Sequence, residues 1–308
     1  MRNYRGALLT RRAVVWTGAL GLLGAAASLA GCGGAAPAGG GSSKVVTTIY
    51  PLAYLAGRLL GDESRVSCMV PAGTEPHDWE PTPTDVAAIQ SASLFVYNGA
   101  GLEGWVSDVL SSLGAEAPRS LCATDGVALR TAGSGTTDPH VWLAPSLAVT
   151  QAQAIASALE AALPDQKDAI RGNLDALMAD LLQLDQDYSA RLGACPRKEI
   201  VVSHEAFGYL CDAYGLTQVG IEGLSPDSEP DAARMAQLVD EVRSHGVTTI
   251  FFEELVSPKT AQAIASETGA QVQELNPLEG LTSDELNADE TYLSVMRDNL
   301  AKLEAALS

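Results

Sequence analysis

The sequence predicts an α/β fold of two lobes, each a parallel-type sheet flanked by helices, joined by one long connecting helix. Short β-branched or apolar runs alternate with helical segments in two separate blocks. Such alternation is typical of parallel sheets covered by helices on both faces. One long stretch of helical periodicity lies between the blocks. The length of 308 residues also suits two domains of roughly 100–200 residues each.

The first block contains four candidate strands, each a short β-branched or apolar run: 44–50, 66–70, 94–97 and 120–123. Helical spacing predicts helices over residues 51–60 and 84–91. Because Thr84 precedes Asp85 at the start of the second of these helices, we expect Thr84 to be its N-cap.

The second block repeats the alternation. Its candidate strands are 199–203, 218–221, 247–252 and 272–275. Its candidate helices are 206–214, 232–245, 258–268 and 292–307. Gly215 and Gly246 follow two of these helices and are expected to end them.

The connecting helix is predicted over residues 164–191, which contain no internal Pro and a single Gly. Five apolar residues recur there at three- and four-residue steps and form one stripe: Leu174, Leu177, Leu181, Leu184 and Tyr188. About 28 residues at ~1.5 Å each give a helix of roughly 42 Å. A helix of that length is typical of a connector between lobes.

The charge balance excludes one class of partner. The chain has 19 Lys and Arg against 38 Asp and Glu, which gives a formal net charge of −19. Phosphate backbones repel such a chain, so nucleic-acid binding is not expected.

The N-terminus predicts export. Residues 1–12 carry four arginines and no acidic residue, and an apolar run follows over residues 13–30. These are the charged and apolar regions of a signal peptide. Residues 10–14 also loosely match a twin-arginine export signal, so the export route stays open between Sec and twin-arginine.

The end of the signal indicates a lipid anchor. Leu29-Ala30-Gly31-Cys32 resembles the lipobox of bacterial lipoproteins, in which the cysteine becomes the acylated N-terminus. We therefore predict a signal peptide over residues 1–31, lipidation of Cys32 and a flexible Gly/Ala/Ser-rich tether over residues 32–43. An ordinary signal peptide with a chance cysteine is the alternative.

Four further cysteines have no metal or redox spacing: Cys68, Cys122, Cys195 and Cys211. In an oxidising compartment they could form one or two disulfides or remain structural thiols.

Three of the four histidines stand in similar places. His77 and His204 follow candidate strands, and His140 lies in a Pro-bounded loop before a helical run. Ligand sites in open α/β sheets form at the carboxyl ends of strands. The pattern leaves two interpretations open, a metal site or separate hydrogen-bonded surface histidines. His245 precedes Gly246 at a predicted helix end, where a cation favours the helix dipole.

Six segments together resemble the zinc/manganese ABC-transporter solute-binding lipoproteins. They are TTIYP (47–51), GTEPHDWEP (73–81), VYNGAG (96–101), DPHVW (138–142), VSHEAF (202–207) and LNPLEGL (275–281). The resemblance covers residues 45–307, with the motifs in the family's order. It implies two α/β lobes, a rigid connecting helix and a metal site in the cleft between the lobes.

The resemblance also implies the metal ligands. The family's three histidines fall on His77, His140 and His204, and its carboxylate falls on Glu279. Two rivals for the carboxylate, Glu253 and Glu254, stand at the end of a candidate strand. We expect them to cap the following helix or face solvent.

Close to the first histidine, Glu75 is expected to shape the turn. His204 is predicted to open a helix whose dipole disfavours the imidazolium form. Metal capture should then fail below about pH 6, when the ligands become protonated.

Three imidazoles and one carboxylate suit Zn²⁺ well and Mn²⁺ tolerably. The PHDWEP and NPLEGL motifs are more similar to the zinc branch of the family than to the manganese branch. Many zinc members carry a histidine-rich loop before the second histidine, whereas residues 123–137 here contain no histidine. A scavenging or sensing role for that loop is therefore not expected.

The resemblance implies a monomeric, exported, non-enzymatic receptor that is lipid-anchored to the outer face of the cell membrane, or periplasmic, and hands a metal to an ABC permease. The alternatives are a manganese receptor, a zinc hydrolase with Glu279 as base, and an adhesin. Expected boundaries are 44–163 for the N-terminal lobe, 164–193 for the connector and 194–308 for the C-terminal lobe.

Overall fold

The structure is a computed structural model that describes residues 44–132, 135–225, 230–255 and 257–308. All of these residues belong to one compact unit. The predicted signal peptide, the lipidation site Cys32 and the tether over 32–43 lie outside the described residues.

The first parallel sheet has the strand order β2-β1-β3-β4. Its strands are β1 (Val45–Thr47), β2 (Val66–Cys68), β3 (Leu94–Tyr97) and β4 (Ser120–Cys122). The predicted strand over 44–50 is shorter than expected, because Ile49 already caps a helix that has Pro51 in its first turn.

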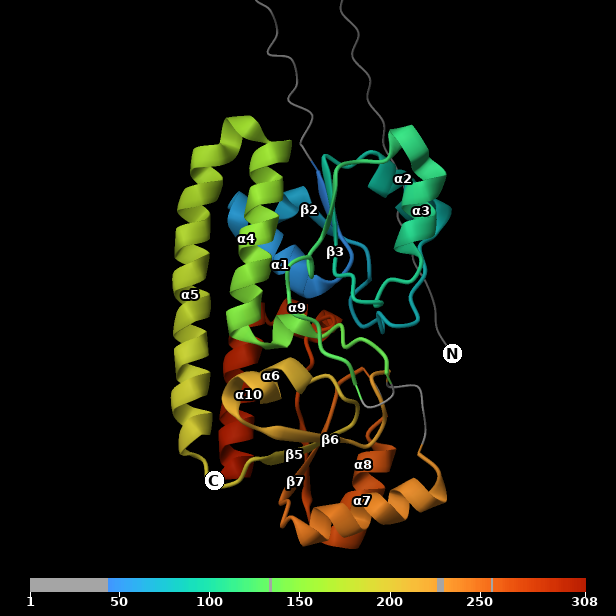
Figure 1. Cartoon of the computed structure of the whole chain (residues 1–308), viewed down its shortest axis with the longest axis vertical. Helices are drawn as coiled ribbons and strands as arrows, with labels where there is room; N and C mark the ends of the chain where they lie inside the picture. The colour runs from blue at the N-terminus through green and yellow to red at the C-terminus, as the bar shows by residue number, and fades with distance from the viewer. Residues whose placement is uncertain (1–43, 133–134, 226–229, 256) are drawn as a thin grey trace, which may run out of the picture. The chain divides into compact units, whose positions relative to one another are not determined.

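The second sheet repeats this topology as β6-β5-β7-β8, again with every neighbouring pair parallel. Its strands are β5 (Glu199–Val202), β6 (Thr217–Gly220), β7 (Thr249–Phe252) and β8 (Gln271–Glu274). The two sheets flanked by helices confirm the predicted α/β fold class (Figure 1).

Helices connect the strands of each sheet. Those before the connector are α1 (Tyr50–Leu60), α2 (Pro83–Gln90), α3 (Val106–Leu113) and α4 (Pro145–Ala162). Those after it are α6 (Gly208–Tyr214), α7 (Ala232–Ser244), α8 (Lys259–Thr268), α9 (Ser283–Asn287) and α10 (Tyr292–Leu307). Short 3-10 turns occupy Glu63–Arg65, Gly114–Glu116, Val141–Leu143 and Pro164–Gln166.

The predicted N-cap of α2 was wrong by two residues. Thr82, not Thr84, caps this helix: Asp85 N donates to Thr82 Oγ1 at 3.4 Å, and Thr82 N donates to Asp85 Oδ2 at 2.8 Å. This reciprocal pair is a capping box, and Pro83 occupies the first helical position.

The predicted connector is the helix α5 (Lys167–Ala194), with 28 residues. It packs beside α4, α1 and α10 (Figure 1). Of its predicted stripe, Leu177, Leu181, Leu184 and Tyr188 are fully buried. They join a single hydrophobic core that includes strand residues of both sheets, Val96 of β3 and Val202 of β5 among them. The two lobes therefore share one core along this helix.

Among the described residues, all four cysteines are free thiols: Cys68, Cys122, Cys195 and Cys211. Cys68 and Cys122 stand in β2 and β4, the two edge strands of the first sheet. Three strand spacings of about 4.8 Å separate them, far beyond the reach of a disulfide. The thiol alternative is therefore the one observed.

No helix in the described ranges combines the length and apolarity that a membrane span requires.

Candidate metal centre

The four predicted ligands all follow the carboxyl ends of strands. His77 lies in the loop after β2, and His140 lies between β4 and the turn Val141–Leu143. His204 follows β5 by two residues, and Glu279 lies in the loop after β8. Each lobe therefore supplies two of the four side chains, as parallel sheets favour at this edge.

These four side chains converge on one point. The ligand atoms of His77, His140, His204 and Glu279 all lie within 4.8 Å of one another. His140 Nε2 is 3.3 Å from His77 Nε2 and 3.4 Å from His204 Nε2. The hypothesis of separate surface histidines is therefore wrong for these three.

Glu279 completes the cluster. Its Oε1 atom lies 3.0 Å from His140 Nε2, 3.2 Å from His204 Nε2 and 3.3 Å from His77 Nε2. A tetrahedral shell with metal–ligand bonds of about 2.0–2.1 Å separates its ligand atoms by about 3.3–3.4 Å. The donor set and its spacing thus fit a small four-coordinate cation such as Zn²⁺.

The cluster is closed to solvent on three sides. His140, His204 and Glu279 are at most 1 % exposed, whereas the His77 side chain is 12 % exposed. His77 is therefore the most exposed of the four candidate ligands.

Within the cluster, His204 and Glu279 stabilise each other's charged forms. Burial alone would lower the pKa of His204, but the charge of Glu279 and a hydrogen bond with Glu253 outweigh it and hold that pKa well above its usual value. Burial likewise opposes ionisation of Glu279, yet His204 and the other histidines hold the Glu279 pKa well below its usual range. Without a cation, His204 and Glu279 thus form a buried ion pair.

Asp138 orients His140. Its Oδ1 atom accepts hydrogen bonds from His140 Nδ1 at 2.8 Å and from His140 N at 3.0 Å. Asp138 is 2 % exposed. A proton held on Nδ1 leaves the lone pair of Nε2 free to bind a cation at the cluster. Asp138 was not among the predicted site residues, although its place two residues before His140 was a usable signal.

Glu253 orients His204 in the same way. Its Oε1 atom accepts from His204 Nδ1 at 2.7 Å and from Ser203 Oγ at 2.9 Å. The expectation that Glu253 caps a helix or faces solvent was wrong, because its side chain is 2 % exposed. The reason is the register: β5 and β7 are neighbours and pair Val202 with Phe251. The residues that follow the two strands therefore meet.

Two other carboxylates considered from the sequence, Glu75 and Glu254, lie outside the cluster. Glu75 Oε1 accepts from His77 N at 3.1 Å, in line with its expected role in the turn. Burial, reinforced by the charge of Glu279, raises the pKa of Glu75 to about 8. Glu254 is half-buried, and burial raises its pKa to about 8. Glu254 belongs to no group of metal-binding geometry among the described residues.

The predicted helix start at His204 was also wrong. Helix α6 begins at Gly208, and His204 lies in a bend four residues earlier. The helix dipole therefore does not set the protonation of His204. The carboxylates Glu279 and Glu253 do, and they act in the opposite direction from the one predicted.

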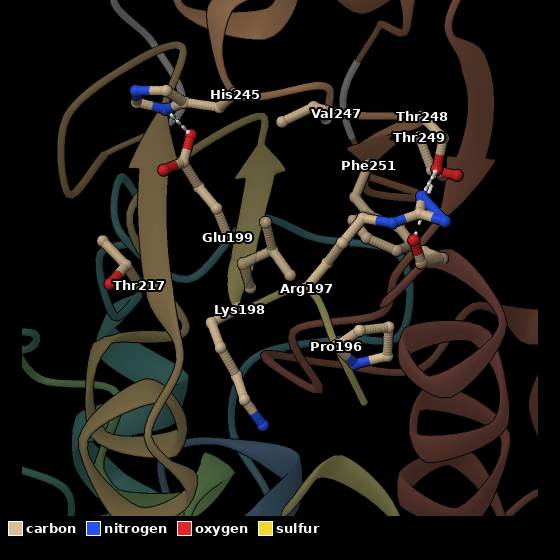
Figure 2. A pocket seen from close by; sticks show the side chains of 12 residues that line it. Pro196, Arg197, Lys198, Glu199, Thr217, His245, Val247, Thr248, Thr249 and Phe251 are labelled. Atoms are coloured by element: carbon tan, nitrogen blue, oxygen red, sulfur yellow. Dashed lines mark hydrogen bonds and ion pairs between the residues drawn. The ribbon is translucent and has the colours of Figure 1, made fainter. Parts of the chain in front are cut away.

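The fourth histidine lies elsewhere. His245 forms the C-cap of α7, as expected, and its Nδ1 atom pairs with Glu199. It lines a pocket of about 400 Å³ at the amino ends of the second sheet's strands (Figure 2). The basic groups there already have protein partners, since Arg197 Nη1 donates to Thr248 Oγ1 at 3.2 Å and Lys198 Nζ donates to Leu192 O at 2.7 Å.

Comparisons with known proteins point to the same chemistry. The sequence model of a family described as "Zinc-uptake complex component A periplasmic" (ZnuA) matches residues 45–306. The "High-affinity zinc uptake system protein ZnuA" of Bacillus subtilis is 37% identical over 311 residues, which cover 95% of this chain and 98% of that protein. The "Zinc-binding lipoprotein AdcA" of Streptococcus pneumoniae is 38% identical over 278 residues, which cover 86% of this chain but 56% of that protein. The chain thus spans little more than half the length of its AdcA relatives.

Solved structures share the fold. The Zn(II)-bound ZnuA-like domain of Streptococcus pneumoniae AdcA has 39% sequence identity and a TM-score of 0.78, and the match covers 86% of this chain and 98% of that one. The laminin-binding protein Lmb of Streptococcus agalactiae, described as bifunctional with adhesin and metal transporting activity, has 36% identity and a TM-score of 0.80, with 86% and 99% covered.

Proposed function

Because the chain belongs to the ZnuA family of periplasmic zinc-uptake components, which covers its residues 45–306, we propose that it captures Zn²⁺ outside the cytoplasm and delivers it to an ABC permease. One observation carries the proposal. Three imidazole nitrogens and one carboxylate oxygen lie within 4.8 Å of one another, and five of their six separations are 3.0–3.4 Å, close to the edges of a tetrahedral zinc shell.

Each lobe has a distinct part in capture. We propose His77 and His140 as the ligands of the first lobe and His204 and Glu279 as those of the second. A cation held between them joins the lobes, and its release requires the ligands of one lobe to separate from those of the other. The lobes are proposed at residues 44–163 and 194–308, with the connector at 164–193.

Zinc is the favoured metal for three reasons. Neutral imidazole and carboxylate ligands in a compact four-coordinate set suit Zn²⁺. Mn²⁺ prefers a larger share of oxygen ligands, of which this cluster supplies one carboxylate. The relatives named above are described by zinc uptake or zinc binding. A manganese receptor of the same family is the alternative.

A binding role, without catalysis, suits the donor set. Catalytic zinc sites typically keep three protein ligands and an open position for water. Here a fourth protein group, Glu279 Oε1, lies 3.0–3.3 Å from the Nε2 atom of each histidine. That is about the spacing between two ligand atoms on one metal ion. In the rival zinc hydrolase, Glu279 would instead act as a base beside a metal-bound water.

The proposal extends to the N-terminus and the oligomeric state. We propose acylation of Cys32 and attachment to the outer face of the membrane through the tether, with a monomer as the working unit. The description of AdcA from Streptococcus pneumoniae as a lipoprotein supports the anchor. Mass spectrometry of the exported protein would detect the acylated Cys32 directly.

Metal analysis and competitive titration test the central claim. The compact unit from residue 41 onward should bind one Zn²⁺ per chain and retain it in excess Mn²⁺. X-ray absorption should find three imidazoles and one carboxylate around the zinc. Preference for Mn²⁺ would assign the protein to the manganese alternative, and a bound water in place of Glu279 would favour the hydrolase.

A further inference from the structure

We infer that Arg130 is a positioning residue that latches the two lobes across the metal centre and slows the release of the cation. It does so by holding Asp138, the carboxylate that orients His140, against helix α6 of the other lobe. The inference rests on the proposed zinc capture and adds a residue to it.

Arg130 belongs to the first lobe and lies between β4 and His140. Asp138 N donates to Arg130 O at 3.0 Å, and Thr131 pairs with Thr137 in an antiparallel bridge. Asp138 is therefore fixed opposite Arg130 by backbone contacts.

The Arg130 side chain reaches across to the second lobe. Its Nη1 atom donates to Gly208 O at 2.8 Å and pairs with Asp212, both in α6. Its guanidinium lies over the Tyr209 ring, 5.8 Å from the centroid, and its backbone N donates to Tyr209 Oη at 2.9 Å. Arg130 is thus bound to helix α6 by hydrogen bonds, an ion pair and a cation–π contact.

The same guanidinium faces the carboxylate that orients His140. Arg130 Nε lies 3.5 Å from Asp138 Oδ2, while Asp138 Oδ1 holds His140 Nδ1 at 2.8 Å. Tyr209 Oη in turn donates to Asp138 O at 2.9 Å. Arg130 and Tyr209 both contact Asp138, which in turn holds His140. The position of His140 is therefore coupled to the approach of α6.

Gly208 leaves the space that this latch requires. A Cβ atom at Gly208 would lie 2.6 Å from Asp138 Oδ2 and 2.7 Å from Arg130 Nε, distances that real Cβ atoms do not adopt. Gly208 does not have a positive φ, so its backbone would accept an alanine. The glycine is thus needed for the close approach of the two charged groups, and not for backbone conformation.

The latch differs from the other ties between the lobes in its access to water. Trp142 Nε1 donates to Pro277 O at 2.8 Å, and Tyr292 Oη donates to Trp142 O at 2.6 Å, both inside the core. The Arg130 side chain is 29% exposed, and its partner Asp212 is 66% exposed. Water can therefore replace these contacts without unpacking the core, as a reversible closure requires.

Stopped-flow release of zinc into a chelator tests the latch in the compact unit from residue 41 onward. Arg130→Ala should speed zinc release up to about 10-fold, the lower end of the range for a lost partner of a metal ligand, because Arg130 contacts Asp138 and not His140 itself. The association rate should stay within about twofold, because no ligand is removed. Arg130→Lys should recover part of the loss, because it keeps the charge but not the planar fork.

Gly208→Ala provides a second, independent variant. It removes no charge and no hydrogen-bonding group, and alanine favours a helix more than glycine does. Its melting temperature should therefore fall less than that of Arg130→Ala, which loses the ion pair and hydrogen bonds outright, while release is still faster. This combination separates a latch from a general loss of stability, and it remains informative if Arg130→Ala fails to fold.

Arg58 offers a matched control within the same chain. Its side chain is also 29% exposed, it pairs with Asp180 at 2.7 Å, and it lies 5.7 Å from the centre of the Tyr54 ring. Arg58→Ala thus removes an equivalent ion pair and cation–π contact from α1 and α5. Its zinc release should stay at the rate of the unaltered protein.

The outcomes are distinct. Release unchanged in both Arg130→Ala and Gly208→Ala would overturn the latch while leaving zinc capture intact. Equal acceleration by Arg58→Ala would also overturn it, because the effect would then reflect stability alone. If the unaltered protein binds no zinc, the proposed function itself fails, and the latch fails with it.

Discussion

The two buried histidines of the metal centre are held by matching carboxylates in different surroundings. His140 and His204 each offer Nε2 to the cluster and bind a carboxylate through Nδ1, at 2.8 Å and 2.7 Å. Glu253, the partner of His204, is also bound by Ser203 of its own lobe. Asp138, the partner of His140, faces Arg130, whose side chain contacts the other lobe.

This difference separates two tasks. The His204–Glu253 pair is set by the neighbouring strands β5 and β7, so it is preorganised within one lobe whether or not the lobes meet. In the His140–Asp138 pair, by contrast, Asp138 also contacts Arg130 and Tyr209, which tie it to α6 of the second lobe. In the proposed latch, the first pair serves recognition of the cation and the second responds to closure of the lobes.

Removal of a ligand is expected to lower zinc affinity most, and by a similar amount for ligands of either pair. His140→Ala, His204→Ala and Glu279→Ala should each weaken zinc binding by more than the roughly 10- to 100-fold cost of a lost outer partner. His245→Ala is the control, because His245 pairs with Glu199 away from the cluster. Competitive titration with a zinc chelator measures all four, and wild-type affinity in the three ligand variants would refute the site.

The outer carboxylates come next and should separate the two pairs. Asp138→Asn and Glu253→Gln should each weaken zinc binding about 10- to 100-fold, because each removes the charge that holds Nδ1–H. The Asp138 variant should also lose most of the effect of Arg130→Ala when the two are combined. The Glu253 variant should combine additively with Arg130→Ala, because the two sites share no partner.

Isothermal titration of the single and double variants gives both coupling energies. Equal coupling of Arg130 to the two carboxylates would remove the distinction between an intralobe pair and a closure-sensitive pair. Absence of coupling to either would leave Asp138 as an orienting group and nothing more.

The pH dependence should belong to the His204 pair. The pKa of His204 is raised and that of Glu279 is lowered, so near neutral pH zinc must displace a proton from His204. Affinity should therefore fall about tenfold per pH unit below the raised pKa, and the fall should begin above the predicted pH of about 6. Zinc titrations at pH 6, 7 and 8 measure the slope. A flat profile would contradict the assignment.

The metal-free protein should respond to pH in the opposite sense. A raised histidine pKa contributes stability that is complete below about pH 6.5 and is lost as the pH rises through the folded-state value. The melting temperature without zinc should thus decrease from pH 6 to pH 8 on this account, while the increment from added zinc grows. Glu253→Gln should shift both trends to lower pH, and Asp138→Asn should shift them less.

The sequence predicted those parts of the molecule that depend on local patterns. The alternation of short apolar runs and amphipathic helices predicted both sheets, and the stripe from Leu177 to Tyr188 predicted α5. The candidate ligands were predicted from the motifs around them, and His77, His140, His204 and Glu279 do converge. These features are encoded within a few residues of each other, so a single sequence contains them.

The features that the sequence did not predict depend on strand order and on contacts between residues far apart in the chain. Glu253 was misplaced because only the pairing of β5 with β7 brings it to His204. The latch from Arg130 to Gly208 joins residues 78 positions apart, and no local pattern marks either residue. Thr82 is the exception, because the box Thr-Pro-Thr-Asp was present in the sequence and Thr84 was chosen in its place.

The smallest expected effect concerns Ser203, which is to Glu253 what Arg130 is to Asp138. Ser203 Oγ donates to Glu253 Oε1 at 2.9 Å, and a hydrogen bond to a charged group contributes about 1.5–3 kcal/mol at most in buried sites. Because Glu253 keeps its contact with His204, Ser203→Ala should lose only part of this, about three- to tenfold in zinc affinity. The release rate should account for no more of that loss than the association rate. If Ser203→Ala instead accelerates release as strongly as Arg130→Ala, then both pairs respond to closure, and the asymmetry between the lobes lies in their ligands alone.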